Sequence, residues 1–288
     1  IFTHMHKLLL STLLIALGVI GCVPEEKTGP DQTGSKVTIP KLGATSPTSY
    51  TNMKLVWADE FDGTALNSEF WSFETGNGSN GWGNNELQFY RTQNTSIQDG
   101  HLVITAKKEP FGGKEYTSSR IITKSKKEFR YGRVDIRAAL PKGQGIWPAL
   151  WMLGSNFDTV SWPACGEIDI MEMIGGGGRE NTVYGTVHWQ NEGKNAKYEG
   201  KTTLSSGTFS DQFAVYSITW DATSIRWFVD NKQYHVIDTT PAELDEFRRN
   251  FFFIFNVAVG GNWPGSPNTT TTFPQHLIVD YVRVFQAN

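Results

Sequence analysis

Three carboxylates lie within the short segment GEIDIMEMIG, residues 166–175, at a spacing that could support acid–base chemistry. They are Glu167, Asp169 and Glu172, and isoleucine and methionine separate them. Acidic side chains are rarely buried without partners, so their place in an apolar segment needs a reason. Like charges held together raise the pKa of at least one acid, as a general acid working near neutral pH requires. Two carboxyls with separated pKa values are the machinery of glycosidic bond hydrolysis.

The segment reads as a β-strand, which fixes where each acid points. Residues two apart share a face, so Glu167 and Asp169 lie together and Glu172 would point the other way. One extra residue in a β-bulge, near Ile170 or Met171, returns Glu172 to the face of the other two acids. We therefore predict a bulge in this strand.

Two other interpretations of the acids stay open on spacing alone. They could form a solvated strand face, or they could hold a cation. Metal binding is the weaker of these, because no Asp/Asn-rich loop surrounds the acids and no histidine lies within ligand spacing along the chain.

The residues elsewhere in the chain favour a sugar as ligand. Sugar rings offer apolar faces and many hydroxyls, and their sites combine flat aromatic side chains with polar groups. The segments GWGNNELQFY, GQGIWPALWMLG, TVHWQ and GGNWPG supply both kinds of group. A core position is the alternative for any single tryptophan.

The body of the chain is predicted to consist of strands. Alternating or continuous apolar patterns mark residues 101–108, 131–140, 213–220, 224–230, 232–238, 251–259 and 276–286. Short strands separated by Gly, Asn and Pro clusters indicate an all-β sandwich. A single short helix is expected after Thr240, with that residue as N-cap, Pro241 at the first helical position and Glu243 completing a capping box.

The first 50 residues differ in composition from the rest. Residues 1–22 are interpreted as an export signal, because a basic start precedes an apolar run too short to span a membrane. The run ends in VIGC, which resembles the lipobox of bacterial lipoproteins and implies lipidation of Cys22; ordinary cleavage is the alternative. Residues 23–50, rich in Pro, Gly, Ser and Thr, are expected to be a flexible linker to a domain spanning residues 51–288.

Composition excludes other functions. The net charge of −3 provides no basic field, so nucleic acid is not an expected partner. Cys22 and Cys165 are the two cysteines, so the domain can hold no disulfide framework. Although Cys165 precedes Glu167 by two residues, a buried apolar thiol is the expected state.

The ordered set of motifs resembles family 16 of the glycoside hydrolases. WPACGEIDIMEMIG looks like the bulged E-x-D-x-x-E signature, and LVWADEFDG, WGNNELQFY, YGRVDIRAALPKGQGIWPALWMLG, NVAVGGNWPG and VDYVRV occur in the expected order. The resemblance implies a β-jelly-roll of two curved antiparallel sheets with a concave substrate cleft. It also implies a retaining double displacement with Glu167 as nucleophile, Glu172 as acid/base and Asp169 tuning the pair.

Within the family, the chain is most similar to laminarinases, which are endo-β-1,3-glucanases. The resemblance implies a β-1,3-glucan substrate, or a mixed β-1,3/1,4-glucan. It places His188 on the leaving-group side of the cleavage point. The residues implied for the non-reducing side are Asn84, Arg120, Trp147, Trp151 and Trp263. A marine galactan hydrolase of the same family and a non-catalytic glycan-binding sandwich are the alternatives.

The family resemblance further implies a structural calcium ion and no catalytic cofactor. The suggested ligands are the carboxylates of Glu60 and Asp280 and the carbonyl of Gly100. Strand alternation places Asp280 on the apolar face of residues 276–286, where an acid needs a cation or a donor network. A hydrogen bond from backbone to Asp280 is the alternative.

We expect an exported bacterial lipoprotein. It would be monomeric and anchored to a membrane by its N-terminal lipid, at the outer membrane, the cell surface or the periplasm. The Gly-rich run Gly175–Gly178 departs from the family pattern and is expected to make the adjoining loop pliable.

Overall fold

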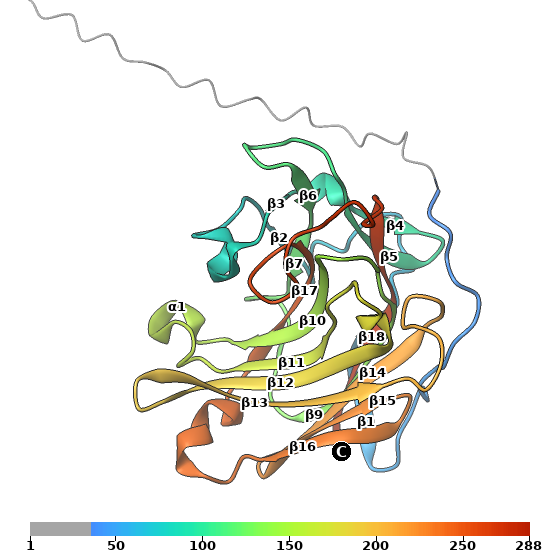
Figure 1. The fold of residues 1–288 in the computed structure, drawn as a ribbon. Helices are drawn as coiled ribbons and strands as arrows, with labels where there is room; N and C mark the ends of the chain where they lie inside the picture. Colours follow the sequence, from blue (N-terminus) through green and yellow to red (C-terminus); the bar gives the residue numbers. More distant parts are fainter. Residues whose placement is uncertain (1–35) are drawn as a thin grey trace, which may run out of the picture. The chain divides into compact units, whose positions relative to one another are not determined.

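Two antiparallel sheets make up most of the computed structural model, which describes residues 36–288 (Figure 1). The β18 sheet contains β1 (Met53–Asp59), β4 (Thr95–Gln98), β5 (His101–Ala106), β9 (Gly132–Ala139), β14 (Ala214–Trp220), β15 (Ser224–Val229), β16 (Lys232–Asp238) and β18 (Gln275–Ala287). The β11 sheet contains β2 (Ser72–Glu74), β7 (Arg120–Ile122), β8 (Glu128–Phe129), β10 (Ile146–Gly154), β11 (Glu167–Glu172), β12 (Thr182–Asn191), β13 (Lys194–Thr203) and β17 (Phe251–Val259). A short parallel pair is formed by β3 (Gln88–Tyr90) and β6 (Tyr116–Ser118).

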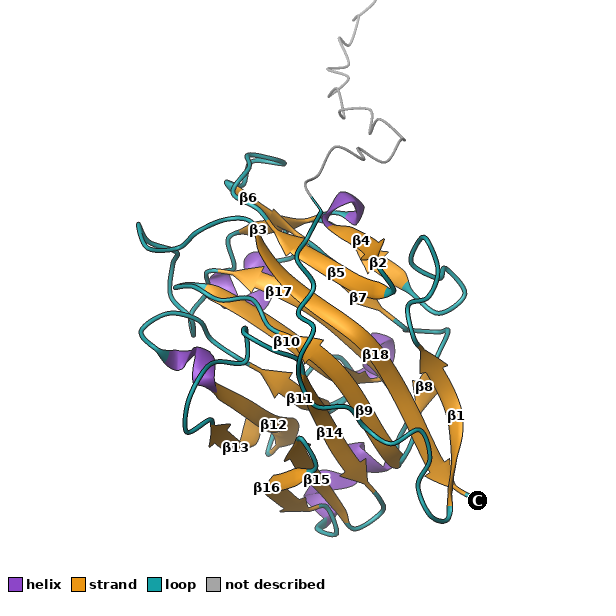
Figure 2. Ribbon diagram, turned by 90° about the vertical axis from the view of Figure 1, so that its right-hand side faces the viewer, coloured by secondary structure: helices purple, strands orange, loops and turns teal. Residues whose placement is uncertain are grey.

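The strand orders place β11 and β18 well inside their sheets. The β18 sheet runs β16-β15-β14-β9-β18-β5-β4, with β1 also paired to β18. The β11 sheet runs β13-β12-β11-β10-β17-β7-β2, with β8 paired to β17. Figure 2 shows the two layers of strands and the loops that join them. The predicted all-β sandwich is confirmed.

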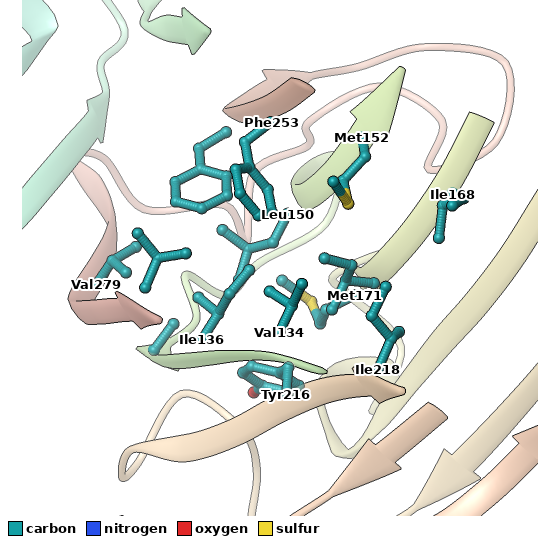
Figure 3. Packing of buried hydrophobic residues seen from close by; sticks show 14 of the residues in the cluster. Val134, Ile136, Leu150, Met152, Ile168, Met171, Tyr216, Ile218, Phe253 and Val279 are labelled. Carbon is teal, nitrogen blue, oxygen red and sulfur yellow. The ribbon is translucent and has the colours of Figure 1, made fainter. Parts of the chain in front are cut away.

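The hydrophobic core fills the space between the two sheets. Figure 3 shows Val134 and Ile136 of β9 facing Leu150 of β10 and Met171 of β11. Each side chain of this size contributes about 1.5–3 kcal/mol when it is fully buried. Strand β17 is buried along its whole length, because alternate residues enter a second apolar cluster on the other face of its sheet. Ile122, Leu153, Cys165, Phe252 and Ile254 form that cluster.

The described part of the predicted linker packs on the domain. Gly43 forms a β-bridge with Phe213, and the carbonyl of Ala44 accepts a hydrogen bond of 2.6 Å from Arg137 Nε. Val37 and Ile39 pack on the outer face of the β18 sheet. The folded unit therefore begins well before the predicted boundary at residue 51. Residues 1–35, which include the predicted signal and Cys22, lie outside the described residues.

The predicted helix forms as a 3₁₀ helix, Ala242–Arg248, and its predicted cap is wrong. The Asp238 carboxylate accepts a 2.8 Å hydrogen bond from the backbone N–H of Thr240, so Thr240 lies inside a turn and does not cap the helix. Leu244 and Phe247, three residues apart, are both buried, which suits the three-residue repeat of a 3₁₀ helix.

The remaining helical segments are shorter. They are α1 (Phe157–Val160) and the turns Gly81–Asn85, Thr92–Asn94 and Arg179–Asn181. No helix within residues 36–288 has the length and apolar character needed to cross a membrane.

Candidate active site

A β-bulge in β11 sets the direction of the three acids. From Asp169 to Glu172, β11 advances three residues, while its partner β12 advances two, from Thr186 to Tyr184. The pairing with β10 on the other side skips Ile170. One extra residue therefore lies in this strand, and the predicted bulge is confirmed.

The bulge lets two consecutive apolar residues reach the core. Ile170 and Met171 are both buried in the cluster between the sheets, together with Ile168. Glu167 and Glu172 are partly exposed, and Asp169 is buried. Glu172 lies beside Trp147 of β10, whose side chain is also partly exposed. The extra residue thus keeps all three acids on the face of the β11 sheet that turns away from the core.

Glu167 is held from two sides. Trp162 Nε1, in the loop before β11, donates a hydrogen bond of 2.9 Å to Glu167 Oε2. His188 Nε2, on the neighbouring strand β12, lies 3.7 Å from Glu167 Oε1. Burial raises the pKa of Glu167, and His188, Trp162, Arg120 and Asp169 each act against that rise. Glu167 is therefore the acid of the three that is best supported as an anion.

Asp169 lies between the other two acids and is only 2% exposed. Its backbone carbonyl accepts a hydrogen bond of 2.8 Å from the buried Trp227 Nε1, which fixes the strand at this point. Burial, and then the charges of Glu167 and Glu172, raise the pKa of Asp169 well above its usual range. The carboxyl of Asp169 is hydrogen-bonded to Glu167, so a protonated Asp169 donates to an ionised Glu167.

Glu172 has a different set of neighbours. Trp147 Nε1 donates a hydrogen bond of 2.9 Å to Glu172 Oε1. The Trp147 ring packs edge-on against Trp263 at 5.5 Å, and Trp263 packs in the same way against Tyr184 at 5.0 Å. Burial, followed by the charge of Glu167, raises the pKa of Glu172 to about 8. At neutral pH this carboxyl carries a proton that it can donate.

Trp151, which follows Trp147 by four residues on β10, is the centre of a second group of aromatic and polar side chains. Trp151 Nε1 donates a 2.8 Å hydrogen bond to Asn256 Oδ1 on β17. The guanidinium carbon of Arg120 lies 4.9 Å from the centre of the Trp151 ring and 4.6 Å from that of Trp82. Arg120 also pairs with Glu74. The arginine is therefore fixed between two indole rings.

Asn84 joins the two loops that flank this region. Its backbone carbonyl accepts a 2.8 Å hydrogen bond from the N–H of Asn262, next to Trp263. Its side-chain Nδ2 donates to Glu86 Oε1 at 3.2 Å. Burial raises the pKa of Glu86, whose other oxygen accepts hydrogen bonds from Gln88 and Tyr90.

Comparison with known proteins identifies the family. The sequence model described as "Glycosyl hydrolases family 16" matches residues 83–283. The chain belongs to glycosyl hydrolase family 16. It is 40% identical over 259 residues to a beta-glucanase of Rhodothermus marinus, covering 85% of this chain and 89% of that protein. The laminarinase catalytic domain of Thermotoga maritima superposes with a TM-score of 0.77 at 45% identity, covering 82% of this chain and 99% of that one.

Family 16 domains also occur inside longer proteins. The chain is 40% identical to part of the clotting factor G alpha subunit of Tachypleus tridentatus, and the matched region covers 34% of that protein. The chain therefore spans about a third of the length of that relative. As a family 16 member the chain is a glycoside hydrolase, and the predicted family and jelly-roll sandwich are both confirmed.

The structure brings the predicted site residues of this family 16 hydrolase together in two groups. Trp147 and Trp263 lie on the Glu172 side, and His188 lies on the Glu167 side. Trp151 and Arg120 are linked to each other. Asn84 reaches the Trp263 loop through its backbone and contacts none of the three acids in the described structure.

Sequence reasoning did not assign four residues that contact this site. Trp162 holds Glu167, Tyr184 packs on Trp263, Asn256 holds Trp151 and Glu86 holds Asn84. The polar Asn256, inside the apolar segment FFFIFNVAV, was a usable signal, and so was the acid in WGNNELQFY. The role of Tyr184 depends on strand pairing, which spacing along the chain does not reveal.

Strand pairing also corrects one sequence argument about metals. No histidine lies near the acids along the chain, but His188 is the direct cross-strand partner of Glu167. One ligand atom each from Glu167, Asp169 and His188 lie within 4.8 Å of one another. The site therefore contains three potential metal ligands at its Glu167 end.

The prediction that Asp280 shares a face with Val282 and Val284 is wrong. The β18–β9 register shifts between Val279 and Tyr281, so a second bulge lies at Asp280. The bulge moves Val282 and Val284 to the core face, while Asp280 lies on the outer face with Ile278. Arg137 Nη1 donates to Asp280 Oδ2 at 2.6 Å, and His101 Nε2 lies 3.3 Å from Asp280 Oδ1. The predicted need for a cation at this carboxylate is met by protein side chains.

Of the other two proposed calcium ligands, Glu60 is also held by an arginine, and Gly100 lies in a turn. Glu60 accepts two hydrogen bonds from Arg283, at 2.7 and 2.8 Å. Gly100 adopts a positive φ of 74° in the turn before β5. Two carboxylates and a carbonyl are hard oxygen donors of the kind that calcium prefers. However, both carboxylates are already neutralised by guanidinium groups, so the fit to a calcium ion is poor.

Cys165 takes no part in catalysis. It lies in the apolar cluster beside Leu153 and Phe252, fully buried. Burial and the nearby Glu167 raise the pKa of the Cys165 thiol to about 12. A thiol in this state is not a nucleophile, as predicted.

Proposed function

We propose that this family 16 hydrolase cleaves internal β-1,3 linkages of glucans and retains the anomeric configuration. The observation that carries the proposal is the pair Glu167 and Glu172, held on one face of a bulged strand in unlike environments. The endo-β-1,3-glucan substrate is supported by the names of the relatives, which include a glucan endo-1,3-beta-glucosidase of Niallia circulans. Mixed β-1,3/1,4-glucans are included in the proposal.

Glu167 serves as the nucleophile. Its carboxylate is supported by Trp162 Nε1, by His188 and by the protonated Asp169, all of which favour the charged form. The attack forms a bond between a Glu167 oxygen and the anomeric carbon, and the glycosidic bond breaks. Asp169 keeps its proton during this step and donates a hydrogen bond to Glu167, which sets the nucleophilicity of the carboxylate.

Glu172 serves as acid and then as base. With a pKa of about 8 it is protonated at neutral pH and can transfer that proton to the departing glycosidic oxygen. The resulting carboxylate accepts a hydrogen bond from Trp147. In the second step it takes a proton from water, which attacks the anomeric carbon and releases Glu167.

The aromatic side chains serve as sugar-binding surfaces. Trp147 and Trp263 stand beside Glu172, and Trp151 stands beside Arg120. Indole faces pack against the apolar faces of sugar rings, while Asn84 and Arg120 provide hydrogen-bond donors. His188 lies at the Glu167 end. We assign it to the leaving-group side, as the resemblance to the family implies.

Product stereochemistry tests the mechanism. Proton NMR during the first minutes of laminarin hydrolysis should show the β-anomer of the new reducing end before mutarotation produces the α-anomer. If the α-anomer forms first, the double displacement is replaced by inversion, and Glu167 is a base instead of a nucleophile.

Product profiles on three polymers test the substrate. Laminarin should be cut fastest into short oligosaccharides, lichenan more slowly and agarose not at all. The galactan alternative has one observation in its favour, because a keratan-sulfate endo-1,4-beta-galactosidase of Sphingobacterium multivorum is 29% identical over 97% of this chain. Faster cleavage of agarose or keratan sulfate than of laminarin would replace the glucan substrate. Saturable glycan binding without any cleavage would favour the non-catalytic sandwich.

We further propose export and lipid anchoring through Cys22, with the enzyme acting as a monomer at a membrane surface. The support is the sequence VIGC after an apolar run. Labelling with a radioactive or clickable palmitate in a bacterial host should mark the wild-type chain and leave a Cys22→Ala variant unmarked.

A structural calcium ion at Glu60, Gly100 and Asp280 is a separate proposal, which the resemblance to the family implies. Its support is the oxygen chemistry of the donors, and the arginine partners of both carboxylates argue against it. A lower Tm after treatment with a chelator, restored by calcium and by no other divalent ion, would support the ion. An unchanged Tm would remove it.

A further inference from the structure

We infer that the Glu167 end of the active site is also a binding site for a zinc-like divalent transition metal, and that occupancy blocks the nucleophile. The ligands are one oxygen each of Glu167 and Asp169 and Nε2 of His188, which lie within 4.8 Å of one another. Carboxylate oxygen and imidazole nitrogen are common ligands of zinc.

The spacing of the three atoms suits an ion between them. His188 Nε2 is 3.7 Å from Glu167 Oε1 and 3.7 Å from Asp169 Oδ2, too far for a hydrogen bond to either. Ligand atoms bound at about 2.0–2.1 Å in a tetrahedral site stand about 3.3 Å apart. The two distances from His188 Nε2 therefore need to shorten by only a few tenths of an ångström for an ion to bind all three residues.

The buried carboxyl oxygen Oδ2 of Asp169 is a second observation that favours a bound metal ion. Asp169 Oδ2 is buried and receives no hydrogen bond from an N–H or hydroxyl group of the protein, and its side chain is only 3% exposed. An oxygen of this kind pays a desolvation cost that a hydrogen bond or a metal ion would relieve. Oδ2 is the atom of Asp169 that faces His188 Nε2. A metal ion bound here would replace the proton that Asp169 shares with Glu167.

The histidine is already oriented as a metal ligand. His188 Nδ1 lies 3.2 Å from Asn195 Oδ1 on β13, and an amide oxygen accepts hydrogen bonds only. The Nδ1 proton is therefore used, and Nε2, which faces the two carboxyls, is the nitrogen that a neutral imidazole offers to a metal ion. Metal-binding histidines are commonly fixed in this way by an acceptor on the other nitrogen.

The consequence for the reaction follows from the shared residues. A metal on Glu167 occupies the oxygen that would attack the sugar, and it stands where the anomeric carbon must come. Zinc should therefore inhibit glucan hydrolysis in competition with substrate. Metal binding itself needs no turnover, so its measurement stands or fails separately from the proposed glucanase function.

The test uses the full-length chain freed of metal with a chelator. Titration calorimetry with zinc chloride should show one ion per chain, and cobalt(II) should give the visible absorption of a four-coordinate ion with one nitrogen and two oxygens from protein. His188→Gln should weaken zinc binding by at least about tenfold. The matched control is His101→Gln, which removes a histidine that lies 3.3 Å from a single aspartate, and it should bind zinc as the wild type does.

Several results would overturn the site. These are no zinc uptake by the wild type, undiminished affinity in His188→Gln, loss of affinity in the His101→Gln control, or equal binding of magnesium and zinc. If His188→Gln does not fold, Asn195→Ala replaces it, because loss of the acceptor should also weaken zinc about tenfold or more. Unchanged zinc affinity in Asn195→Ala would then count against the site.

Discussion

Strands β11 and β18 both contain a bulge next to an acid, and the outcome differs. In β18 the bulged residue, Asp280, lies on the outer face of its sheet against Arg137 and His101. In β11 the bulge leaves Glu167, Asp169 and Glu172 side by side, with no arginine or lysine in direct ion-pair contact among the residues described. The same irregularity thus provides an ion pair in one sheet and a set of unbalanced acids in the other.

The difference shows how partners decide the role of a carboxylate. On the outer face of the β18 sheet, Asp135 is fully buried, and its two oxygens accept hydrogen bonds from Arg133 at 2.8 Å and from Tyr50 at 2.7 Å. An acid with a full set of donors stabilises the fold. The β11 acids have fewer donors than oxygens, and burial raises their pKa values. Because donors are too few, Asp169 and Glu172 carry protons at neutral pH, and Glu172 can donate its proton in the reaction.

The largest expected effect is the loss of activity on substitution of the β11 acids, which have fewer donors than oxygens. Glu167→Gln and Glu172→Gln should each lower kcat/KM on laminarin at least about 10³-fold, because one loses the nucleophile and the other the acid/base. Both variants should keep the wild-type Tm or exceed it, because Glu167→Gln removes a charge from a crowded group of acids and Glu172→Gln replaces a protonated carboxyl by a neutral amide of similar size. Reducing-sugar release and thermal unfolding provide the two measurements. The matched control is Asp280→Asn in the other bulged strand, which should keep wild-type kcat/KM. Wild-type activity in either glutamine variant would refute its assigned role.

The next largest effect is on stability, in the opposite sheet. Asp135→Asn leaves Arg133 buried without its counter-charge, which should lower the free energy of unfolding by about 3–5 kcal/mol. Laminarin hydrolysis per folded molecule should be unchanged, because Asp135 lies in the other sheet. Urea unfolding followed by tryptophan fluorescence measures the loss. A cost below about 1 kcal/mol would show that the buried pair is replaceable and would weaken the contrast between the two sheets.

Much of this contrast was visible in the sequence. The apolar residues around the acids predicted β11, and the change of period between Asp169 and Glu172 predicted its bulge. Local alternation also predicted strands β5, β9, β14, β15 and β16, since each repeats its apolar residues at the two-residue period of a strand facing a core.

Other features depend on contacts between distant residues and could not be predicted in this way. The bulge at Asp280 lies in a strand that is apolar on both faces, so alternation does not reveal the extra residue. The pairing of Glu167 with His188 is a register that nothing in either segment specifies. Residues 36–50 have the composition of a linker, yet Val37, Ile39 and the backbone near Gly43 find partners on the β18 sheet.

The pH dependence of kcat/KM and of stability should reveal the raised pKa of Glu172 in β11. Glu172 must be protonated to act as an acid, so kcat/KM should fall above about pH 8, by about tenfold per pH unit. The stability effect has the same sign. A carboxyl with a raised pKa in the folded state contributes stability that is present below about pH 4.5 and lost as the pH rises through about 8. Both trends can be followed in one buffer series, and activity that stays level to pH 10 would contradict the role of Glu172.

The smallest expected effect isolates one hydrogen bond. Trp147→Phe removes the indole N–H that donates to Glu172 Oε1 and so favours its charged form. Loss of that donor should raise the pKa of Glu172 and move the alkaline fall of kcat/KM upward by up to about one pH unit, the equivalent of one hydrogen bond of about 1 kcal/mol.

Trp151→Phe is the control that makes the Trp147 result specific. Trp151 stands on the same strand and its indole also donates a hydrogen bond, but the acceptor is the amide of Asn256 instead of an acid. This variant should bind glucan less tightly and keep the wild-type pH profile. An equal shift in both variants would mean that removing either indole changes the polarity of the whole site. The Trp147 hydrogen bond would then not be what sets the proton affinity of Glu172.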